Sequence, residues 1–262
     1  MSVRLDTWLV QNGVFGGRDT AKRHVEAGEV TVNGRVVTKP SASVCETDIV
    51  SCSSRERYVG RGGYKLEKAI ETAGIDLHDV VAMDVGASTG GFTDCMRQHG
   101  ARLVYAVDVG SNQLHAKLRE DAAVICLENT DIRDAAVAQR VEETPTFCSI
   151  DVSFISLTQV LPSVLRLLSA DACLVCLIKP QFEAGRSAIG KNGVVKDRAV
   201  HRAVLCDLLT KFAEYGCGCR TLMYSPIRGG EGNIEYLAIL RRGENNALFD
   251  VKSLVEDAFT TL

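Results

Sequence analysis

The stretch VAMDVGASTGGF at residues 81–92 decides the fold of this chain. Its first part, VAMDV, is a short apolar run typical of a buried strand, and the glycines after it open a helix. Asp84 stands at the end of the strand, and Gly86, Gly90 and Gly91 lie in the turn. Glycines there let the backbone adopt positive φ and pass close to a ligand. The stretch therefore predicts a nucleotide-binding turn at the carboxyl edge of a parallel sheet.

Helical and strand patterns alternate outward from this stretch. Residues 65–75 read as a helix with apolar residues on one face. Further strand candidates are RLVYAVDV (102–109), AVICLEN (123–129), TFCSIDV (146–152), ACLVCLIK (172–179), CRTLMYSP (219–226) and EYLAILRR (235–242). The last two are joined by the loop SPIRGGEGN and not by a helix. The pattern predicts an α/β fold, a doubly wound Rossmann-like sheet with an antiparallel edge hairpin.

The N-terminal segment has a different pattern, which reads as helix, helix and hairpin. RLDTWLVQN (4–12) has helical spacing, and a second helix over residues 19–27 ends at Gly28. EVTVNGRVV (29–37) alternates around Asn33-Gly34, a strong hairpin signal. We expect a small α+β domain over residues 1–55, a polar, glycine-rich linker over residues 56–63, and the larger domain over residues 64–262.

Charge gives the N-terminal segment a weak preference for RNA. The whole chain has a formal net charge of −3, yet residues 1–64 carry nine Lys and Arg against seven Asp and Glu. The excess favours contact with a phosphate backbone. The candidate RNA-binding residues on or beside the helices are Arg4, Arg18, Lys22 and Arg23.

Composition excludes several classes of protein. The 262 residues are 46% hydrophobic and 24% charged, as in globular proteins, and no apolar run is long enough to cross a bilayer. The start of the chain lacks the pattern of a signal peptide, so we expect a cytoplasmic protein that does not bind membranes. Ten cysteines are present, including pairs at 173/176 and 217/219. Neither pair has further ligands at matching spacing, so no metal site is predicted.

The turn and the next two strands indicate the cofactor. Asp108 closes the strand YAVDV, where a carboxylate accepts hydrogen bonds from ribose hydroxyls. GASTGG does not match the dinucleotide pattern GxGxxG, and Asn129-Thr130-Asp131 follow the third strand, where S-adenosylmethionine enzymes read adenine. We therefore expect S-adenosyl-L-methionine. The candidate cofactor-binding residues are Asp84, Gly86, Ala87, Ser88, Thr89, Gly90, Gly91, Asp108 and Asp131.

Four ionisable residues stand at positions that suggest catalysis. Lys65 begins the first helix of the larger domain, and Asp151 and Lys179 each end an apolar strand. Glu235 begins the last strand. Because ligands bind at the carboxyl edge of such sheets, we expect Asp151 and Lys179 to converge there.

Two family resemblances extend these expectations. RLDTWLVQNG together with residues 18–44 resembles the S4 RNA-binding domain, over about residues 3–52, and implies that Arg18, Lys22 and Arg23 contact phosphates. Nearly the whole chain is similar to the TlyA, or haemolysin A, family of ribosomal RNA 2′-O-methyltransferases, whose catalytic domain is of the FtsJ type. The motifs are RGGYKL, DVGASTGGFTD, DVSFISL, IKPQFEAGR, NGVVKD and GNIEY.

The second resemblance implies a reaction and its residues. It implies methyl transfer from S-adenosyl-L-methionine to a ribose 2′-hydroxyl, of cytidine, in ribosomal RNA or ribosomal subunits, with no obligate protein partner. The family's catalytic tetrad falls on Lys65, Asp151, Lys179 and Glu235. Lys179 could act as the base that removes the hydroxyl proton or as a cation that stabilises the developing alkoxide, and the sequence leaves both roles open. Tyr58 stands where family linkers often have tryptophan.

Three alternatives come from other classes. Methylation of cytosine C5 needs a cysteine after proline, which is missing, and methylation of an exocyclic amine uses a proline-containing turn where this chain has DVSF. A membrane-lytic protein would need an exposed amphipathic segment, and the C-terminal ALFDVKSLVEDAF reads more simply as a packing helix. A binding module with an inactive enzyme domain conflicts with the complete tetrad.

Overall fold

The computed structural model describes residues 2–15, 17–53, 57–185, 188–190 and 193–262. The chain forms two compact units, Met1–Gly60 and Arg61–Leu262. One residue of the expected linker, Glu56, lies outside the described residues, as do Arg186 and Asn192 of two family motifs. Each unit is described by itself.

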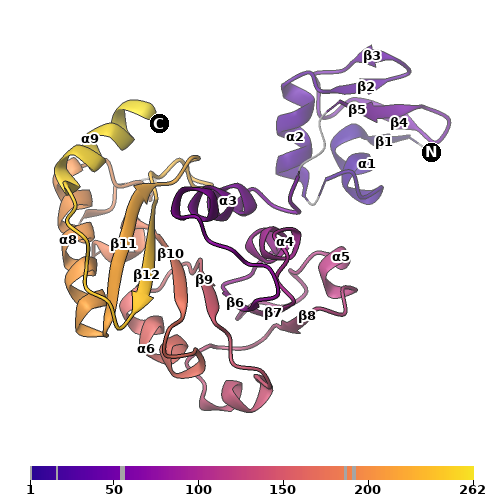
Figure 1. The fold of residues 1–262 in the computed structure, drawn as a ribbon. Coiled ribbons are helices and arrows are strands. Elements are labelled where there is room, and N and C mark those ends of the chain that lie inside the picture. Colours follow the sequence, from indigo (N-terminus) through magenta and orange to yellow (C-terminus); the bar gives the residue numbers. More distant parts are fainter. Residues whose placement is uncertain (1, 16, 54–56, 186–187, 191–192) are drawn as a thin grey trace. The chain divides into compact units, whose positions relative to one another are not determined.

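The smaller unit is the α+β domain that the sequence predicts (Figure 1). Asn33 and Gly34 have φ angles of 52° and 78°, as a two-residue hairpin turn requires. Strands β1, β4 and β5 were not predicted, because three-residue strands are too short to show alternation. The elements are β1 (Ser2–Arg4), α1 (Leu5–Gln11), α2 (Arg18–Glu26), β2 (Val30–Val32), β3 (Arg35–Val36), β4 (Ser43–Cys45) and β5 (Val50–Cys52).

Two small antiparallel sheets cover one apolar core in this unit. β1 pairs with β4, and the second sheet has the order β3-β2-β5. Apolar residues from both helices, from the segment between them and from two strands meet beneath them: Leu5, Leu9, Phe15, Ala21, Val25, Val30 and Val44. Helix α2 buries only Ala21 and Val25, so the charged side of this helix stays on the surface.

The larger unit alternates helices and strands (Figure 1). Its elements are α3 (Gly62–Ala73), β6 (Val81–Val85), α4 (Gly91–Gln98), β7 (Leu103–Val107), α5 (Ala116–Arg119), β8 (Val124–Leu127), the 3₁₀ helix η1 (Ala135–Arg140), β9 (Phe147–Ile150), α6 (Leu157–Leu167), β10 (Cys173–Ile178), α7 (Pro180–Glu183), α8 (Arg198–Glu214), β11 (Cys217–Tyr224), β12 (Tyr236–Arg242) and α9 (Val251–Thr261). All seven strand predictions correspond to strands of this unit.

The seven strands form one sheet with the order β11-β12-β10-β9-β6-β7-β8. The pairs from β8 to β10 are parallel, whereas β12 is antiparallel to both β10 and β11. This confirms the predicted fold class and its antiparallel edge. The chain runs outward from β6 to β8 and then returns to β9 on the other side of β6. Strands β6 and β9 therefore border the crevice in which sheets of this kind bind ligands.

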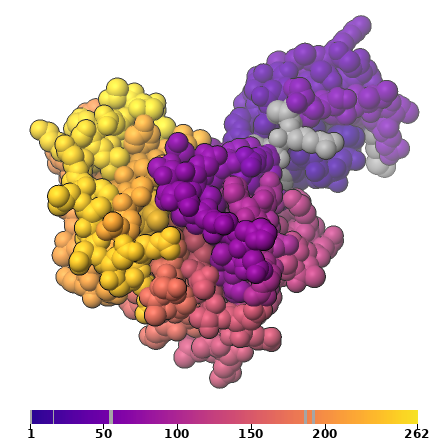
Figure 2. Space-filling view, in the orientation of Figure 1, coloured from indigo at the N-terminus to yellow at the C-terminus, as the bar shows by residue number. Residues whose placement is uncertain are grey.

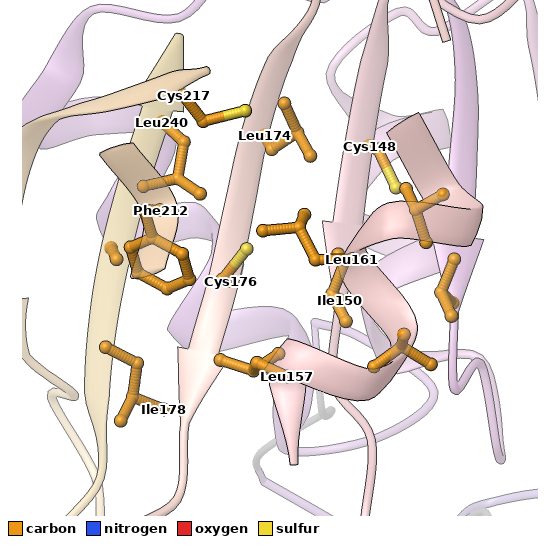
Figure 3. Close-up of a cluster of buried hydrophobic side chains, with 14 of the residues drawn as sticks. Cys148, Ile150, Leu157, Leu161, Leu174, Cys176, Ile178, Phe212, Cys217 and Leu240 are labelled. Atoms are coloured by element: carbon orange, nitrogen blue, oxygen red, sulfur yellow. The ribbon is translucent and has the colours of Figure 1, made fainter. Parts of the chain in front are cut away.

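Alternation along the strands divides the core between the two faces of the sheet. In β6, Val81, Met83 and Val85 join the core that also contains α6, α8 and α9, so Ala82 and Asp84 face the other side. Figure 3 shows part of this core, where Leu157 and Leu161 of α6 lie against Ile150 of β9 and Cys176 of β10. Helix α3 packs against α4 on the opposite face.

The C-terminal helix packs onto the larger unit. Val255 and Ala258 of α9 are fully buried, and the helix contacts α8 and β11. Figure 2 shows α9 (yellow) at the surface of this unit beside the orange segments. The amphipathic segment is thus a packing helix, as predicted.

Candidate active site

The glycine turn after β6 touches the loop that follows β9. Gly86 has a φ of +84°, and a Cβ atom there would lie 2.3 Å from the carbonyl oxygen of Asp151. Only glycine tolerates both the conformation and this approach. Gly90 has a φ of +95°, and a Cβ atom there would meet Leu118 at 2.3 Å. Backbone packing therefore requires glycine at position 86 and brings the turn to the end of β9, whereas Gly90 is favoured by its positive φ.

A cavity of about 340 Å³ opens beside this turn, and we name it the Asp108 cavity. The carboxylate of Asp108 accepts hydrogen bonds from the backbone N–H of Ser88 at 2.8 Å and of Gly110 at 2.7 Å. These bonds fix the carboxylate, and each oxygen keeps a lone pair for a hydroxyl. The apolar lining residues are Val85, Val107, Val109, Ile132, Val152, Phe154, Ile155 and Val160. The cavity thus combines apolar walls with one fixed acceptor at a strand end.

Asp131 lines the far wall of the Asp108 cavity. Its carboxylate accepts hydrogen bonds from the side chain of Arg133, the shortest at 2.6 Å, and from the Arg133 backbone N–H at 2.9 Å. The side-chain bond from Arg133 lowers the pKa of Asp131 below its ordinary value. The carboxylate therefore stays ionised, as an acceptor for an amino group must.

A smaller cavity of about 130 Å³ lies against the glycine turn itself. Residues of the turn line it together with Gly62, Phe92 and Asp151; those of the turn are Gly86, Ala87, Ser88, Thr89 and Gly91. Gly90, also a candidate cofactor-binding residue, does not line it. Asp151 lines this cavity and the Asp108 cavity, so the two meet at the end of β9.

Asp84 differs from its expected role. It is fully buried and lines none of these cavities. Its carboxyl group accepts hydrogen bonds from the hydroxyls of Thr93 at 2.6 Å and Ser149 at 2.9 Å. Burial raises the pKa of Asp84 to about 7. Asp84 thus joins β6 to α4 and β9 beneath the turn and lines neither of the two cavities beside it.

Asp151 and Lys179 form an ion pair at the ends of two adjacent parallel strands. Lys179 Nζ lies 2.6 Å from Asp151 Oδ1, without the angles of a hydrogen bond, and donates a hydrogen bond of 2.9 Å to Ser153 Oγ. Because β9 and β10 are paired in parallel, their carboxyl ends meet at one edge. The side chains of Lys179 and Asp151 are 12% and 22% exposed, so the pair is shielded but reachable.

Lys65 and Glu235 form a second ion pair, across 170 residues of chain. Lys65 Nζ donates a hydrogen bond of 2.5 Å to Glu235 Oε2, and both side chains are buried. Because β12 is antiparallel to β10, its beginning lies at the carboxyl end of β10, where Tyr236 pairs with Ile178. Helix α3 packs against β12 and supplies the lysine. The topology thus brings all four tetrad residues to one edge of the sheet.

A third cavity, of about 670 Å³, adjoins this edge, and we name it the Lys179 cavity. Lys179 and Glu235 line it, and it shares Ser153 and Phe154 with the Asp108 cavity. The Asp151–Lys179 pair therefore stands between two cavities, one beside the glycine turn and one beyond the lysine. Such an arrangement suits the transfer of a group from a ligand in one cavity to a ligand in the other.

Sequence reasoning missed the aromatic wall of the Lys179 cavity. Phe154 is 91% exposed and has a φ of +63°, which is rare for an aromatic residue. Its ring lies 4.9 Å from that of Phe182, and Lys179 Nζ lies 5.8 Å from the Phe182 ring. The motifs DVSF and KPQF each contain one of these residues, but nothing in their spacing indicates that the two rings lie together. Gln181 and Glu231 of the same cavity were also missed.

The RNA-binding candidates lie on the surface of the smaller unit. Arg4, Arg18 and Lys22 line a shallow cavity of about 460 Å³, together with the buried carboxylate of Asp6. Arg4 and Arg18 pair with Asp6 at 2.7 and 3.3 Å, and the hydrogen bond from Arg4 holds the pKa of Asp6 far below its ordinary value. Arg23 lies exposed on α2, outside this cavity.

Neither a membrane-spanning helix nor a metal-binding cluster occurs among the described residues. No helix among them is both long and apolar enough to span a membrane. No group of three or more His, Cys, Asp or Glu residues in the same part of the chain could hold a metal ion. Cys173, Cys176, Cys217 and Cys219 are buried within strands β10 and β11.

Comparisons with known proteins agree with this fold. The FtsJ-like methyltransferase family model matches residues 58–242, and the S4 domain model matches residues 3–50. The chain is 42% identical to a candidate rRNA methyltransferase of Bacillus subtilis, YqxC, over 99% of this chain and 95% of that protein. It is 36% identical to the 16S/23S rRNA (cytidine-2′-O)-methyltransferase TlyA of Mycobacterium tuberculosis, over 94% and 92%.

A solved structure is similar over the whole chain as well. It is that of a candidate hemolysin from Streptococcus thermophilus, with 42% identity and a TM-score of 0.80, covering 99% of this chain and 96% of that chain. Fold, site and family model together define an FtsJ-like methyltransferase that carries an S4 domain. The chain belongs to the family of the TlyA ribosomal RNA methyltransferases.

Proposed function

We propose that this chain transfers a methyl group from S-adenosyl-L-methionine to the ribose 2′-hydroxyl of a cytidine in ribosomal RNA. The observation that carries the proposal is the Asp151–Lys179 pair between the Asp108 cavity and the Lys179 cavity. The tetrad offers no thiol or proline-framed amide, which methylation of a base would use. The relatives named above support cytidine and the 2′-oxygen.

The residues present fit the cofactor. The Asp108 carboxylate suits the hydroxyls of a ribose, Asp131 suits an adenine amino group, and the apolar walls suit the adenine ring. The small cavity along the glycine turn suits the methionine part, close to Asp151. When bound, the cofactor supplies an electrophilic methyl group on a sulfonium.

The tetrad would hold and polarise the acceptor oxygen. An in-line displacement needs the 2′-oxygen fixed as its proton leaves. Lys179 Nζ donates to Ser153 Oγ and contacts Asp151, so its third N–H can be donated to the 2′-oxygen. Because Lys179 is paired with the Asp151 carboxylate, this geometry favours the cationic role: Lys179 orients the hydroxyl and stabilises the developing alkoxide, and the hydroxyl proton is released to water.

Lys65 and Glu235 would help to fix the geometry of the site around Lys179. Their buried ion pair joins α3 to the start of β12 and places a fixed carboxylate in the Lys179 cavity. A fixed charge pair needs no reorganisation during the reaction, which is the advantage of a preorganised site. The exposed ring of Phe154 and the half-buried ring of Phe182 beside it offer the base of the target nucleotide an aromatic surface.

The smaller unit would deliver the ribosomal RNA. Arg18, Lys22 and Arg23 lie on the exposed side of α2, where they can contact phosphates without reading bases. Such contacts position the RNA, and the larger unit then selects the nucleotide. We propose the ribosomal subunits of the cytoplasm as the substrate, with no membrane involved. A membrane-lytic activity has no such support, since the apolar side of α9 is buried.

Methylation of purified subunits tests the proposal. Small and large ribosomal subunits from cells that lack this chain are incubated with the protein and labelled S-adenosyl-L-methionine, and the RNA is digested to nucleosides. We expect label in 2′-O-methylcytidine from at least one subunit, and none with a Lys179→Ala control. Label on a base, or no label in either subunit, would contradict the proposal.

A further inference from the structure

Two hydrogen-bond acceptors of the Lys179 cavity lack a partner among the described residues. The amide oxygen of Gln181 is enclosed yet accepts no hydrogen bond from them. Glu231 is exposed and forms no ion pair or hydrogen bond within the described chain. Both residues line the cavity that begins at Lys179. A buried acceptor without a donor is costly, so such a group needs an explanation.

The other polar side chains of this cavity are already engaged. Asn233 accepts a hydrogen bond from the Val195 N–H at 3.1 Å and donates one to the Gly193 carbonyl at 3.0 Å. Glu235 is paired with Lys65. Three groups are therefore left for a ligand. Lys179 contacts the ribose 2′-oxygen in the proposed reaction, and Gln181 and Glu231 are hydrogen-bond acceptors that lack a partner within the described chain.

The backbone that presents Gln181 is firmly anchored. Gln181 lies in α7, two residues after Lys179. The carboxylate of Glu183, in the same short helix, joins it to the start of α6. Glu183 accepts hydrogen bonds of 2.6 Å from Ser156 Oγ and 2.8 Å from the Leu157 N–H. The place of Gln181 in the wall of the Lys179 cavity is therefore held by the backbone of α7.

Hydrogen-bond acceptors that lack a partner, such as those of Gln181 and Glu231, favour a ligand with a hydrogen-bond donor. Glu231 carries a negative charge at a site for polyanionic RNA, which is unfavourable unless the charge has a task there. Among groups on a base edge, the exocyclic amine of cytosine is a donor that carboxylates and amide oxygens accept. Uracil has a carbonyl oxygen at the same position. This oxygen cannot donate a hydrogen bond, so it would face both protein acceptors unfavourably.

We propose that Gln181 and Glu231 together recognise the exocyclic amine of the target base and thereby select cytosine over uracil. This inference rests on the proposed function, because it concerns the nucleotide whose 2′-oxygen reaches Lys179. It assigns base selection to residues outside the catalytic tetrad. The tetrad acts on the ribose, which is the same in every nucleotide.

A comparison of two RNA substrates tests the proposal. Ribosomal subunits are reconstituted with RNA that has, at the methylated position, either cytidine or the 2-pyrimidinone ribonucleoside, in which hydrogen replaces the amine. The full chain is compared with a Gln181→Met, Glu231→Met double variant, and kcat/KM is measured on both substrates. Cofactor affinity by calorimetry shows that the variant is folded.

We expect loss of the amine to lower kcat/KM of the wild type about tenfold, the effect of one charge-assisted hydrogen bond. For the double variant we expect less than about a twofold difference between the two RNAs, because neither acceptor remains. Glu244→Met is the matched control, because Glu244 is exposed, pairs with Arg220 at 3.1 Å and lines neither large cavity. This control should keep the full discrimination of the wild type.

Two results would overturn the inference. Either the amine makes no difference to the wild type, or its loss costs the wild type and the double variant the same factor. In both cases the wild type still methylates ribose, so the proposed function stands. A wild type that methylates neither RNA overturns the proposed function and this inference with it.

Discussion

The sheet edge that carries the four tetrad residues, in the larger unit, and helix α2 of the smaller unit hold their charges in opposite ways. At the edge, the side chains of Lys65, Glu235 and Lys179 are 10%, 3% and 12% exposed, and each has an opposite charge within 2.6 Å. On α2, the side chains of Arg18 and Lys22 are 60% and 57% exposed, with partners at 3.3 and 3.8 Å. Shielded pairs interact strongly and have one geometry, whereas exposed charges are screened and adaptable.

The difference fits the proposed division of tasks between the units. Methyl transfer needs atoms fixed before the reaction, so its charges are bonded to one another. Docking on RNA needs the sum of several phosphate contacts, none of which must be precise. We therefore expect single substitutions at the edge to have large, specific effects and those on α2 to have small, additive ones.

The largest effect is expected for Lys179→Ala. Loss of the ammonium beside Asp151 should lower the transfer rate by roughly 10²–10⁴-fold, the range for a general acid–base or electrostatic group. Cofactor affinity by calorimetry should be unchanged, because Lys179 does not line the Asp108 cavity. A loss of cofactor affinity would show that Lys179 has another role. Partial activity in Lys179→Arg, which keeps the positive charge, would support the cationic role over the base.

Breaking the Lys65–Glu235 pair should destabilise the fold as well as lower activity. Lys65→Met leaves the buried carboxylate of Glu235 without its cation, which costs about 3–5 kcal/mol of unfolding free energy. Denaturation by urea measures this. The double variant Lys65→Met, Glu235→Leu should recover most of the stability but not the activity. If both single and double variants have wild-type stability, the pair is not buried in solution.

The raised pKa of the buried Asp84 carboxyl group should make the stability of the fold depend on pH. Its folded pKa of about 7 lies above the ordinary value of 3.8, so the folded state binds the proton more tightly. The contribution of Asp84 is therefore greatest below about pH 4, and the unfolding free energy falls as pH rises towards about 7, by roughly 4 kcal/mol at most. Asp84→Asn should remove this part of the pH dependence. Parallel curves for the variant and the wild type across this pH range would contradict the prediction.

The smallest effects are expected on α2. Lys22→Ala should weaken binding to ribosomal RNA only a few-fold and reduce the slope of log affinity against log salt by about one. The maximal transfer rate should not change. Lys252→Ala on α9 is the matched control, an exposed lysine of the larger unit. If Lys22→Ala lowers the maximal rate while the salt slope stays the same, the division of tasks proposed here is wrong.

The functional positions differed in how far sequence could predict them. Strand ends can be read from apolar runs, so the sequence correctly predicts that Asp108, Asp151 and Lys179 lie at the carboxyl edge of the sheet. Asp84 was misplaced because alternation along β6 turns its side chain to the face beneath the turn. Phe154, Gln181 and Glu231 left no periodic signal, since loops have no repeating geometry that relates spacing to direction.

The sequence alone determined the order of strands and helices, the glycine turn and the hairpin at Asn33-Gly34, because local spacing and φ preferences specify them. Tertiary structure decided which strand ends and helix ends lie next to one another. It made β12 antiparallel and so placed Glu235 beside Lys65, 170 residues away, and it set the Asp151–Lys179 pair between two cavities. Such contacts depend on the order of strands in the sheet and on the path of loops, which no local pattern encodes.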